Sequence, residues 1–141
     1  MKVSSNWMLS GKLWAFISQQ KIHVDNFNLF RFKYKSEYAD GSDADLSGAK
    51  AYARYGKGIQ ACLAAVDGKQ IYAGPVTGLM IGEVEELWDM VALVEYPSLA
   101  AMQKMMSSPE YRAIEVHRKA GLAGQLNIRT SQIGRWHHET Y

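Results

Sequence analysis

The stretch Leu87-Trp-Asp-Met-Val-Ala-Leu-Val-Glu-Tyr96 is the most strand-like part of the chain and decides the fold class. Apolar and aromatic side chains dominate it, and the turn-forming run Gly82-Glu-Val-Glu-Glu86 stands directly before it. Residues 70–80 are also strand-like, although Gly74 and Pro75 interrupt them, which is typical of a bulge or an edge strand. The two segments together predict a β-hairpin.

Two further strands and two helical regions flank this hairpin. Residues 27–35 and 125–133 alternate with a period of two, which predicts a first and a last strand. Ser47 is a suitable N-cap for a helix that reaches about Val66, before the helix-ending pair Asp67-Gly68.

The second helical region lies between the hairpin and the last strand. Pro97-Ser98 opens it, and Ser107-Ser-Pro109 divides it into two segments. Gly121 is the residue type expected just past its end.

The resulting order, β-α-β-β-α-β, is the split βαβ unit of ferredoxin-like folds. It predicts an α+β domain whose antiparallel sheet carries its helices on one face. The right-handed crossover rule places the first strand between the last and the third, with the second at the edge. An apolar stripe between Asn6 and Gln20 predicts an extra N-terminal helix. We therefore expect a helical extension at residues 1–24, one domain at 25–134 and a tail at 135–141.

Composition excludes several classes of partner. Sixteen basic and fourteen acidic residues are scattered along 141 positions, without the basic run that tracks nucleic-acid phosphates. The apolar stretch Trp7–Ile17 is too short to span a membrane and contains Lys12. Cys62 is the only cysteine, so no intramolecular disulfide can form, which suits the cytoplasm.

Cofactor motifs are missing from the sequence. No Gly-x-Gly-x-x-Gly opens a helix, no phosphate loop is present, and no Gly-x-Ser-x-Gly follows a strand. His137-His138 lacks the companion ligands of a zinc site. We expect neither a metal nor a nucleotide cofactor.

Several short motifs resemble those of the domain-of-unknown-function 1330 family. They are Val94-Glu-Tyr-Pro-Ser98, Ser108-Pro-Glu-Tyr-Arg112, His117-Arg118, the helix with Tyr52 and Tyr55, and the turn Asp67-Gly68-Lys69. The resemblance covers about Asn28 to Thr130 and leaves both ends of the chain outside it. It implies membership of the dimeric α/β-barrel superfamily, in which two sheets of a homodimer close into one barrel with small-molecule pockets.

The sheet face away from the helices offers one candidate site. We expect the helices to cover the more apolar strand positions, Trp88 among them, which leaves Arg31, Asp89 and Arg129 on the opposite face. Inside a closed barrel these three side chains would be desolvated and would need to pair. They could bind an anionic or enolate-like substrate, or they could form a structural ion-pair network. Asp89 is also a candidate for proton transfer, and Trp88 a candidate for substrate contact.

The helices offer a second set of candidates. His117 could act as a general base at a pocket mouth, with Tyr111 and Arg118 as substrate contacts, or His117 and Arg118 could simply complement the helix C-terminus. Tyr52 and Tyr55 share a helix face and could hydrogen-bond a carbonyl, with Tyr55 as the better candidate for catalysis, or they could belong to the core.

Two functions remain open from these residues. The first is a cofactor-free enzyme of the isomerase, cyclase or monooxygenase kind. It would act on a small organic acid or ketone, such as an aromatic or polyketide-like one, by proton transfer or oxygenation. The second is a ligand-binding or interaction module without turnover. Haem binding, with His117 as axial ligand, is a third option.

Overall fold

The structure is a computed structural model that describes residues 23–132. Its elements are β1 (Val24–Phe32), α2 (Gly48–Ala64), β2 (Lys69–Pro75), β3 (Met90–Tyr96), α3 (Leu99–Met106), α4 (Pro109–Gly121) and β4 (Leu122–Thr130). The predicted N-terminal helix and C-terminal tail lie outside these residues.

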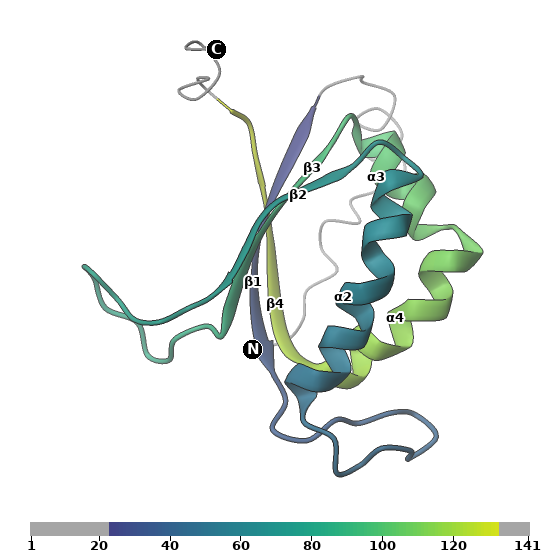
Figure 1. Ribbon diagram of the computed structural model, residues 1–141. Coiled ribbons are helices and arrows are strands. Elements are labelled where there is room, and N and C mark those ends of the chain that lie inside the picture. The colour runs from purple at the N-terminus through teal and green to yellow at the C-terminus, as the bar shows by residue number, and fades with distance from the viewer. Residues whose placement is uncertain (1–22, 133–141) are drawn as a thin grey trace, which may run out of the picture.

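The four strands form one antiparallel sheet in the order β2-β3-β1-β4. This is the order predicted from the crossover rule, so the α+β ferredoxin-like topology is confirmed. Figure 1 shows α2, α3 and α4 together on one face of the sheet, and none of the helices within residues 23–132 lies on the other face. The domain therefore has two layers, with its buried core between helices and sheet.

The strand boundaries differ from those predicted. β1 begins at Val24 and ends at Phe32, so the expected strand residue Tyr34 lies in the following loop and is 89% exposed. Regular pairing between β2 and β3 ends at Pro75 and Met90, and the Val76 N–H makes one further backbone hydrogen bond to the Asp89 carbonyl at 2.9 Å. Residues 76–89 instead form a long arm that projects away from the sheet (Figure 1).

Serine caps fix where the helices begin. The Ser47 hydroxyl accepts a hydrogen bond from the Lys50 backbone N–H at 3.2 Å, and Ser98 accepts one from Ala101 at 3.1 Å. Ser108 caps α4 in the same way, with Pro109 in its first turn. The predicted caps Ser47 and Ser98 are thus confirmed.

A close backbone contact joins the start of α2 to the end of α4. The Lys33 N–H donates to the Gly121 carbonyl at 2.8 Å, and the Gly48 N–H donates to the Lys33 carbonyl at 3.1 Å. A Cβ atom on Gly121 would lie 2.5 Å from the Gly48 carbonyl oxygen, so no larger residue fits there without a shift. This contact sets α2 and α4 side by side above the sheet.

Two groups of buried side chains make up the core. One joins α2, α3, α4 and β3 and contains Ile59, Cys62, Leu63, Tyr96, Met102, Met105 and Tyr111; the other contains Phe30, Tyr52, Ala92 and Leu122. Tyr55 packs against both groups. Cys62 is buried as predicted, and burial raises the pKa of its thiol. None of the helices within residues 23–132 is long and apolar enough to cross a bilayer.

Candidate active site between helices and sheet

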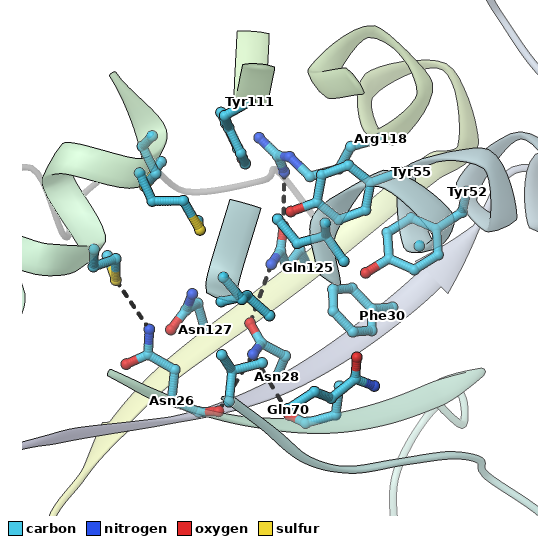
Figure 2. A pocket seen from close by; sticks show the side chains of 18 of the residues that line it. Asn26, Asn28, Phe30, Tyr52, Tyr55, Gln70, Tyr111, Arg118, Gln125 and Asn127 are labelled. Carbon is cyan, nitrogen blue, oxygen red and sulfur yellow. Dashed lines mark hydrogen bonds between the residues drawn. The ribbon is translucent and has the colours of Figure 1, made fainter. Parts of the chain in front are cut away.

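A cavity of about 660 Å³ lies between the helix layer and the sheet. Its floor is formed by alternate residues of β1 and β3 together with residues 125–127 of β4, and its walls by α2, α3 and α4. The volume falls in the range typical of small-molecule sites. Figure 2 shows polar side chains from strands and helices pointing into the same space.

A line of polar side chains crosses the cavity floor. Gln125 donates from Nε2 to the Asn28 Oδ1 at 3.2 Å, and the Asn28 amide nitrogen lies 3.3 Å from the Asn26 carbonyl and 3.5 Å from that of Ala92. Asn26 and Asn28 are only 4% and 5% exposed. Because a buried amide without a partner costs free energy, these contacts fix the Asn28 side chain in place.

Arg118 of α4 contacts Gln125 at the helix-side end of this line of polar side chains (Figure 2). Its Nη1 donates to the Gln125 Oε1 at 2.8 Å, while its Nη2 lies 3.9 Å from a Glu115 carboxylate oxygen. The same Glu115 oxygen lies 3.6 Å from the Lys119 ammonium. Arg118 Nε is buried and has no hydrogen-bond partner. The guanidinium therefore keeps an unused donor beside the cavity.

Phenol groups form the aromatic wall. Tyr55 lies between Tyr52 and Tyr111, with ring centroids 5.3 and 6.2 Å away. Burial raises the pKa of Tyr55 well above its usual range, and the neighbouring Tyr111 adds to this effect. Burial also raises the pKa of Tyr52, against the opposing charge of Arg118. Both phenols are protonated at neutral pH and can donate hydrogen bonds.

Methionines line the other end of the cavity. Met102, Met105 and Met106 come from α3, and the Met102 sulfur lies 3.1 Å from the Asn26 Nδ2. Their unbranched thioether chains adapt to irregular apolar shapes. The cavity thus has a cationic end at Arg118 and an apolar end at α3.

The structure does not form the predicted cluster of Arg31, Asp89 and Arg129. Arg31 pairs with Glu86 at 3.5 Å, and the Asp89 carboxylate accepts the Phe32 backbone N–H at 2.8 Å. Arg129 is paired across the strands with Asn26, so it lies on the helix-facing side, where it is exposed. None of the three lines the cavity.

Trp88 also departs from its predicted position. Its ring lies 4.6 Å from the Arg31 guanidinium and contacts Gly124, the residue paired with Arg31. It therefore covers the face opposite the helices. The alternation inferred from β3 does not extend to Trp88, because regular pairing starts only at Met90.

His117 lies on the outer side of α4 and does not line the cavity. Its Nδ1 is 2.6 Å from the Tyr38 hydroxyl, which in turn accepts from Arg54 at 3.2 Å. Arg54 is also paired with Asp43 at 2.8 Å. These contacts hold the loop between β1 and α2 against α4. Of the predicted site residues, Tyr52, Tyr55, Tyr111 and Arg118 are brought together in the cavity.

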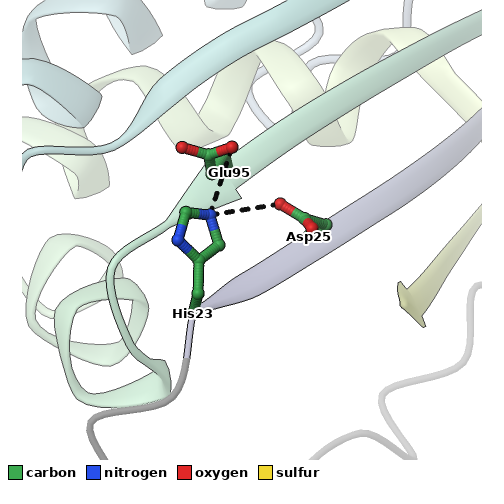
Figure 3. Close-up of side chains that lie close together, drawn as sticks. All are labelled: His23, Asp25 and Glu95. Atoms are coloured by element: carbon green, nitrogen blue, oxygen red, sulfur yellow. Dashed lines mark ion pairs between the residues drawn. The ribbon is translucent and has the colours of Figure 1, made fainter. Parts of the chain in front are cut away.

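One histidine–carboxylate group lies on the uncovered face, at the start of β1 (Figure 3). His23 Nε2 is 3.3 Å from Asp25 and 3.1 Å from Glu95, and one ligand atom from each lies within 4.8 Å of the others. These residue types can bind a divalent cation. The imidazole lies between both carboxylates as an ion pair, which accounts for the geometry.

Sequence reasoning missed Asn26, Asn28 and Gln125. A signal was present, because Asn26 and Asn28 alternate with apolar residues of β1 and Gln125 stands beside Leu126 in β4. The alternation of β1 already groups Asn26 and Asn28 with Phe30, whereas assigning Gln125 to the helix side required the pairing of β4 with β1, in which Gln125 stands opposite Phe30. The same pairing puts Ile128 on the uncovered face, opposite Phe27.

The family model described as "Domain of unknown function (DUF1330)" matches residues 42–129. The chain belongs to this family. The RPA0582 protein of Rhodopseudomonas palustris, of unknown function, is similar at 29% identity, with a TM-score of 0.75 over 90% of this chain and 96% of that one. A methylated form of RPA0582 gives 30% identity and a TM-score of 0.77, over 89% of this chain and 93% of that one. No curated protein matches the chain.

More distant structures share only the fold of this DUF1330 chain. A dimeric ferredoxin-like protein of unknown function from Bacteroides fragilis has 14% identity and a TM-score of 0.53, covering 78% of this chain and 96% of its own. SnoaB, a cofactor-independent oxygenase from Streptomyces nogalater, has 10% identity and a TM-score of 0.51, covering 81% and 96%. The fold thus occurs in a small-molecule enzyme that works without a cofactor.

The buried phenols give a testable pH dependence. Burial raises the folded-state pKa of Tyr52, Tyr55 and Tyr96 above the unfolded value of about 10. Their contribution to stability is therefore complete below about pH 10 and is lost as the pH rises further. In an alkaline titration followed by tyrosinate absorbance, we expect exposed tyrosines to ionise first and these three to ionise only with unfolding.

Single substitutions separate the two steps of that titration. Tyr55→Phe should reduce the late step, which coincides with loss of circular dichroism, whereas the control Tyr34→Phe, at a residue that is 89% exposed, should leave the late step unchanged. A smaller early step in Tyr55→Phe would show that the Tyr55 hydroxyl is open to solvent.

Proposed function

We propose that this protein is a cofactor-independent enzyme that transfers a proton on a small organic acid or ketone bound between the helices and the sheet. The observation that carries the proposal is a cavity of ligand size in which a fixed polar line ends at a partly unpaired arginine. Convergent polar groups in an otherwise apolar cavity are typical of substrate sites. SnoaB supports the proposal by combining this fold with cofactor-independent chemistry.

The cavity supplies a group for each part of such a transfer. Glu115 is the carboxylate among the described lining residues, and it would accept a proton from the carbon next to a carbonyl. The electron pair of that C–H bond would form a carbon–carbon double bond as the π pair of the carbonyl moves onto its oxygen, giving an enolate. The protonated Tyr55 hydroxyl would donate a hydrogen bond to this oxygen, and Glu115 would return the proton to carbon.

Proton transfer can be measured directly as deuterium uptake. We expect the wild-type protein to catalyse exchange at the carbon next to the carbonyl of small aryl ketones in D2O, followed by NMR. Tyr55→Phe and Glu115→Gln should each slow exchange by about 10²-fold or more, the typical cost of losing one such group. Glu110→Gln is a matched control, because Glu110 lies on the same helix outside the cavity.

Exchange that is unchanged in both Tyr55→Phe and Glu115→Gln would contradict the proposed roles. Ligand binding without exchange on any ketone would favour the alternative function, a binding module without turnover. One observation supports that alternative. The predicted proton-transfer groups His117 and Asp89 lie outside the cavity, so its described lining offers more hydrogen-bond donors than groups that can accept a proton.

We also propose that the protein works as a homodimer through the uncovered face of the sheet. Phe27 pairs with Leu93 and Ile128 on neighbouring strands, and Leu29 pairs with Val91. Directly paired residues share a face, so these side chains form one apolar surface. Phe27 is 37% and Ile128 44% exposed in the single chain. A second sheet would bury both, and the Bacteroides fragilis relative with this fold is dimeric.

Light scattering tests the assembly. We expect twice the chain mass for the wild type and for Val116→Asp, which changes an exposed apolar residue of α4. Phe27→Asp should give a monomer, because it would bury an unpaired charge in the interface. A monomeric wild type at micromolar concentration, or a dimer that persists in Phe27→Asp, would contradict this arrangement.

A further inference from the structure

The Arg118 Nε–H, which has no hydrogen-bond acceptor, indicates which class of ligand the cavity can bind. Arginine stays charged at all ordinary pH values and offers five N–H donors in a planar fork. Only one of its close contacts is a full hydrogen bond, and the acceptor is the neutral amide of Gln125. The Nε donor is buried and unpaired, which is costly unless a ligand completes it.

Glu115 does not satisfy this guanidinium. Its oxygen lies 3.9 Å from Arg118 Nη2, beyond hydrogen-bond distance, and is closer to Lys119 at 3.6 Å. The three side chains together carry one net positive charge. A ligand with a single negative charge would balance it, whereas a dianion would exceed it.

Arg118 is also held in a fixed orientation. The Gln125 side-chain oxygen accepts a hydrogen bond from Arg118 Nη1, and its nitrogen donates one to Asn28. The Asn28 amide nitrogen in turn faces backbone carbonyls of β1 and β3. A donor positioned in advance loses little entropy when a ligand binds. This arrangement favours a planar acceptor that fits the fork, which a carboxylate does.

The far end of the cavity defines the rest of the ligand. The polar line runs from Arg118 through Gln125 and Asn28 to Asn26, where the Met102 sulfur lies (Figure 2). Met105 and Met106 extend this apolar end. A ligand that spans the cavity would meet a cation at one end and thioethers at the other.

We infer that the cavity selects small monocarboxylates with an apolar body, with the carboxylate on Arg118 and the body against the methionines of α3. This inference rests on the ligand cavity of the proposed function and names its ligand class. Equilibrium binding tests it without turnover, so binding without deuterium exchange would overturn only the catalytic proposal.

Hydrocinnamate and hydrocinnamide form a matched pair of probes, because they share an aryl body and differ in charge. By calorimetric titration at neutral pH, the wild type should bind the acid about tenfold or more tightly than the amide, as expected for hydrogen bonds to a charged group. Arg118→Gln should remove this preference. Arg118→Lys should keep part of it, because the charge remains but the fork is lost.

Arg112→Gln is the matched control, since Arg112 is an exposed residue of the same helix and does not line the cavity. It should keep the wild-type preference. Thermal unfolding of each variant shows whether the fold is intact. The inference is overturned if the wild type binds acid and amide equally or does not bind hydrocinnamate, or if a folded Arg118→Gln keeps the preference.

Discussion

Asn28 places an amide in the middle of the sheet face that the helices cover, and its need for partners organises the cavity. At 5% exposure it cannot exchange its hydrogen bonds with bulk water. Gln125 donates a hydrogen bond to the Asn28 side-chain oxygen, and Arg118 donates one to the Gln125 side-chain oxygen. A core filled only with apolar side chains would close this space. The polar line keeps α4 and the sheet connected through hydrogen bonds and leaves room beside them.

The topology could be predicted from the sequence because its signals are local or follow from chirality. Ser47 and Ser98 mark the helix starts because their hydroxyls accept hydrogen bonds from first-turn backbone N–H groups that have no partner within the helix. The crossover rule then leaves one strand order for β-α-β-β-α-β. The strand ends could not be predicted, because they depend on pairing. β1 ends at Phe32, beside a bulge in its pairing with β4, although its alternation continues to Tyr34.

The site was predicted in part, for a physical reason. Tyr52, Tyr55, Tyr111 and Arg118 share helix faces that the 3.6-residue period makes visible. The strand residues were assigned by assuming that helices cover the apolar side of every strand. β4 does the opposite: its amides face the helices, and Ile128 faces outward with Phe27. Arg129 consequently lies on the helix side and cannot join Arg31. Helix burial alone does not explain this pattern, but a sheet covered on its other face by a second chain does.

The proposals for ligand, chemistry and assembly assign separate roles to the two faces of the sheet. The helix-covered face carries the cavity, and the uncovered face would carry the proposed dimer interface. Within the cavity, the Arg118 guanidinium, proposed to bind an anion, and the phenol of Tyr55 lie near one another around the same space, as Figure 2 shows. A bound acid or ketone could therefore present its oxygen to fixed donors while the methionines hold its body.

The position of bound hydrocinnamate in a crystal of the protein tests this account most directly. The account predicts a carboxylate oxygen about 3 Å from Arg118 Nε, with the aryl ring against Met102 and Met105. A carboxylate bound at Arg31 on the uncovered face, or an aryl ring at Arg118 with the carboxylate among the methionines, would contradict it.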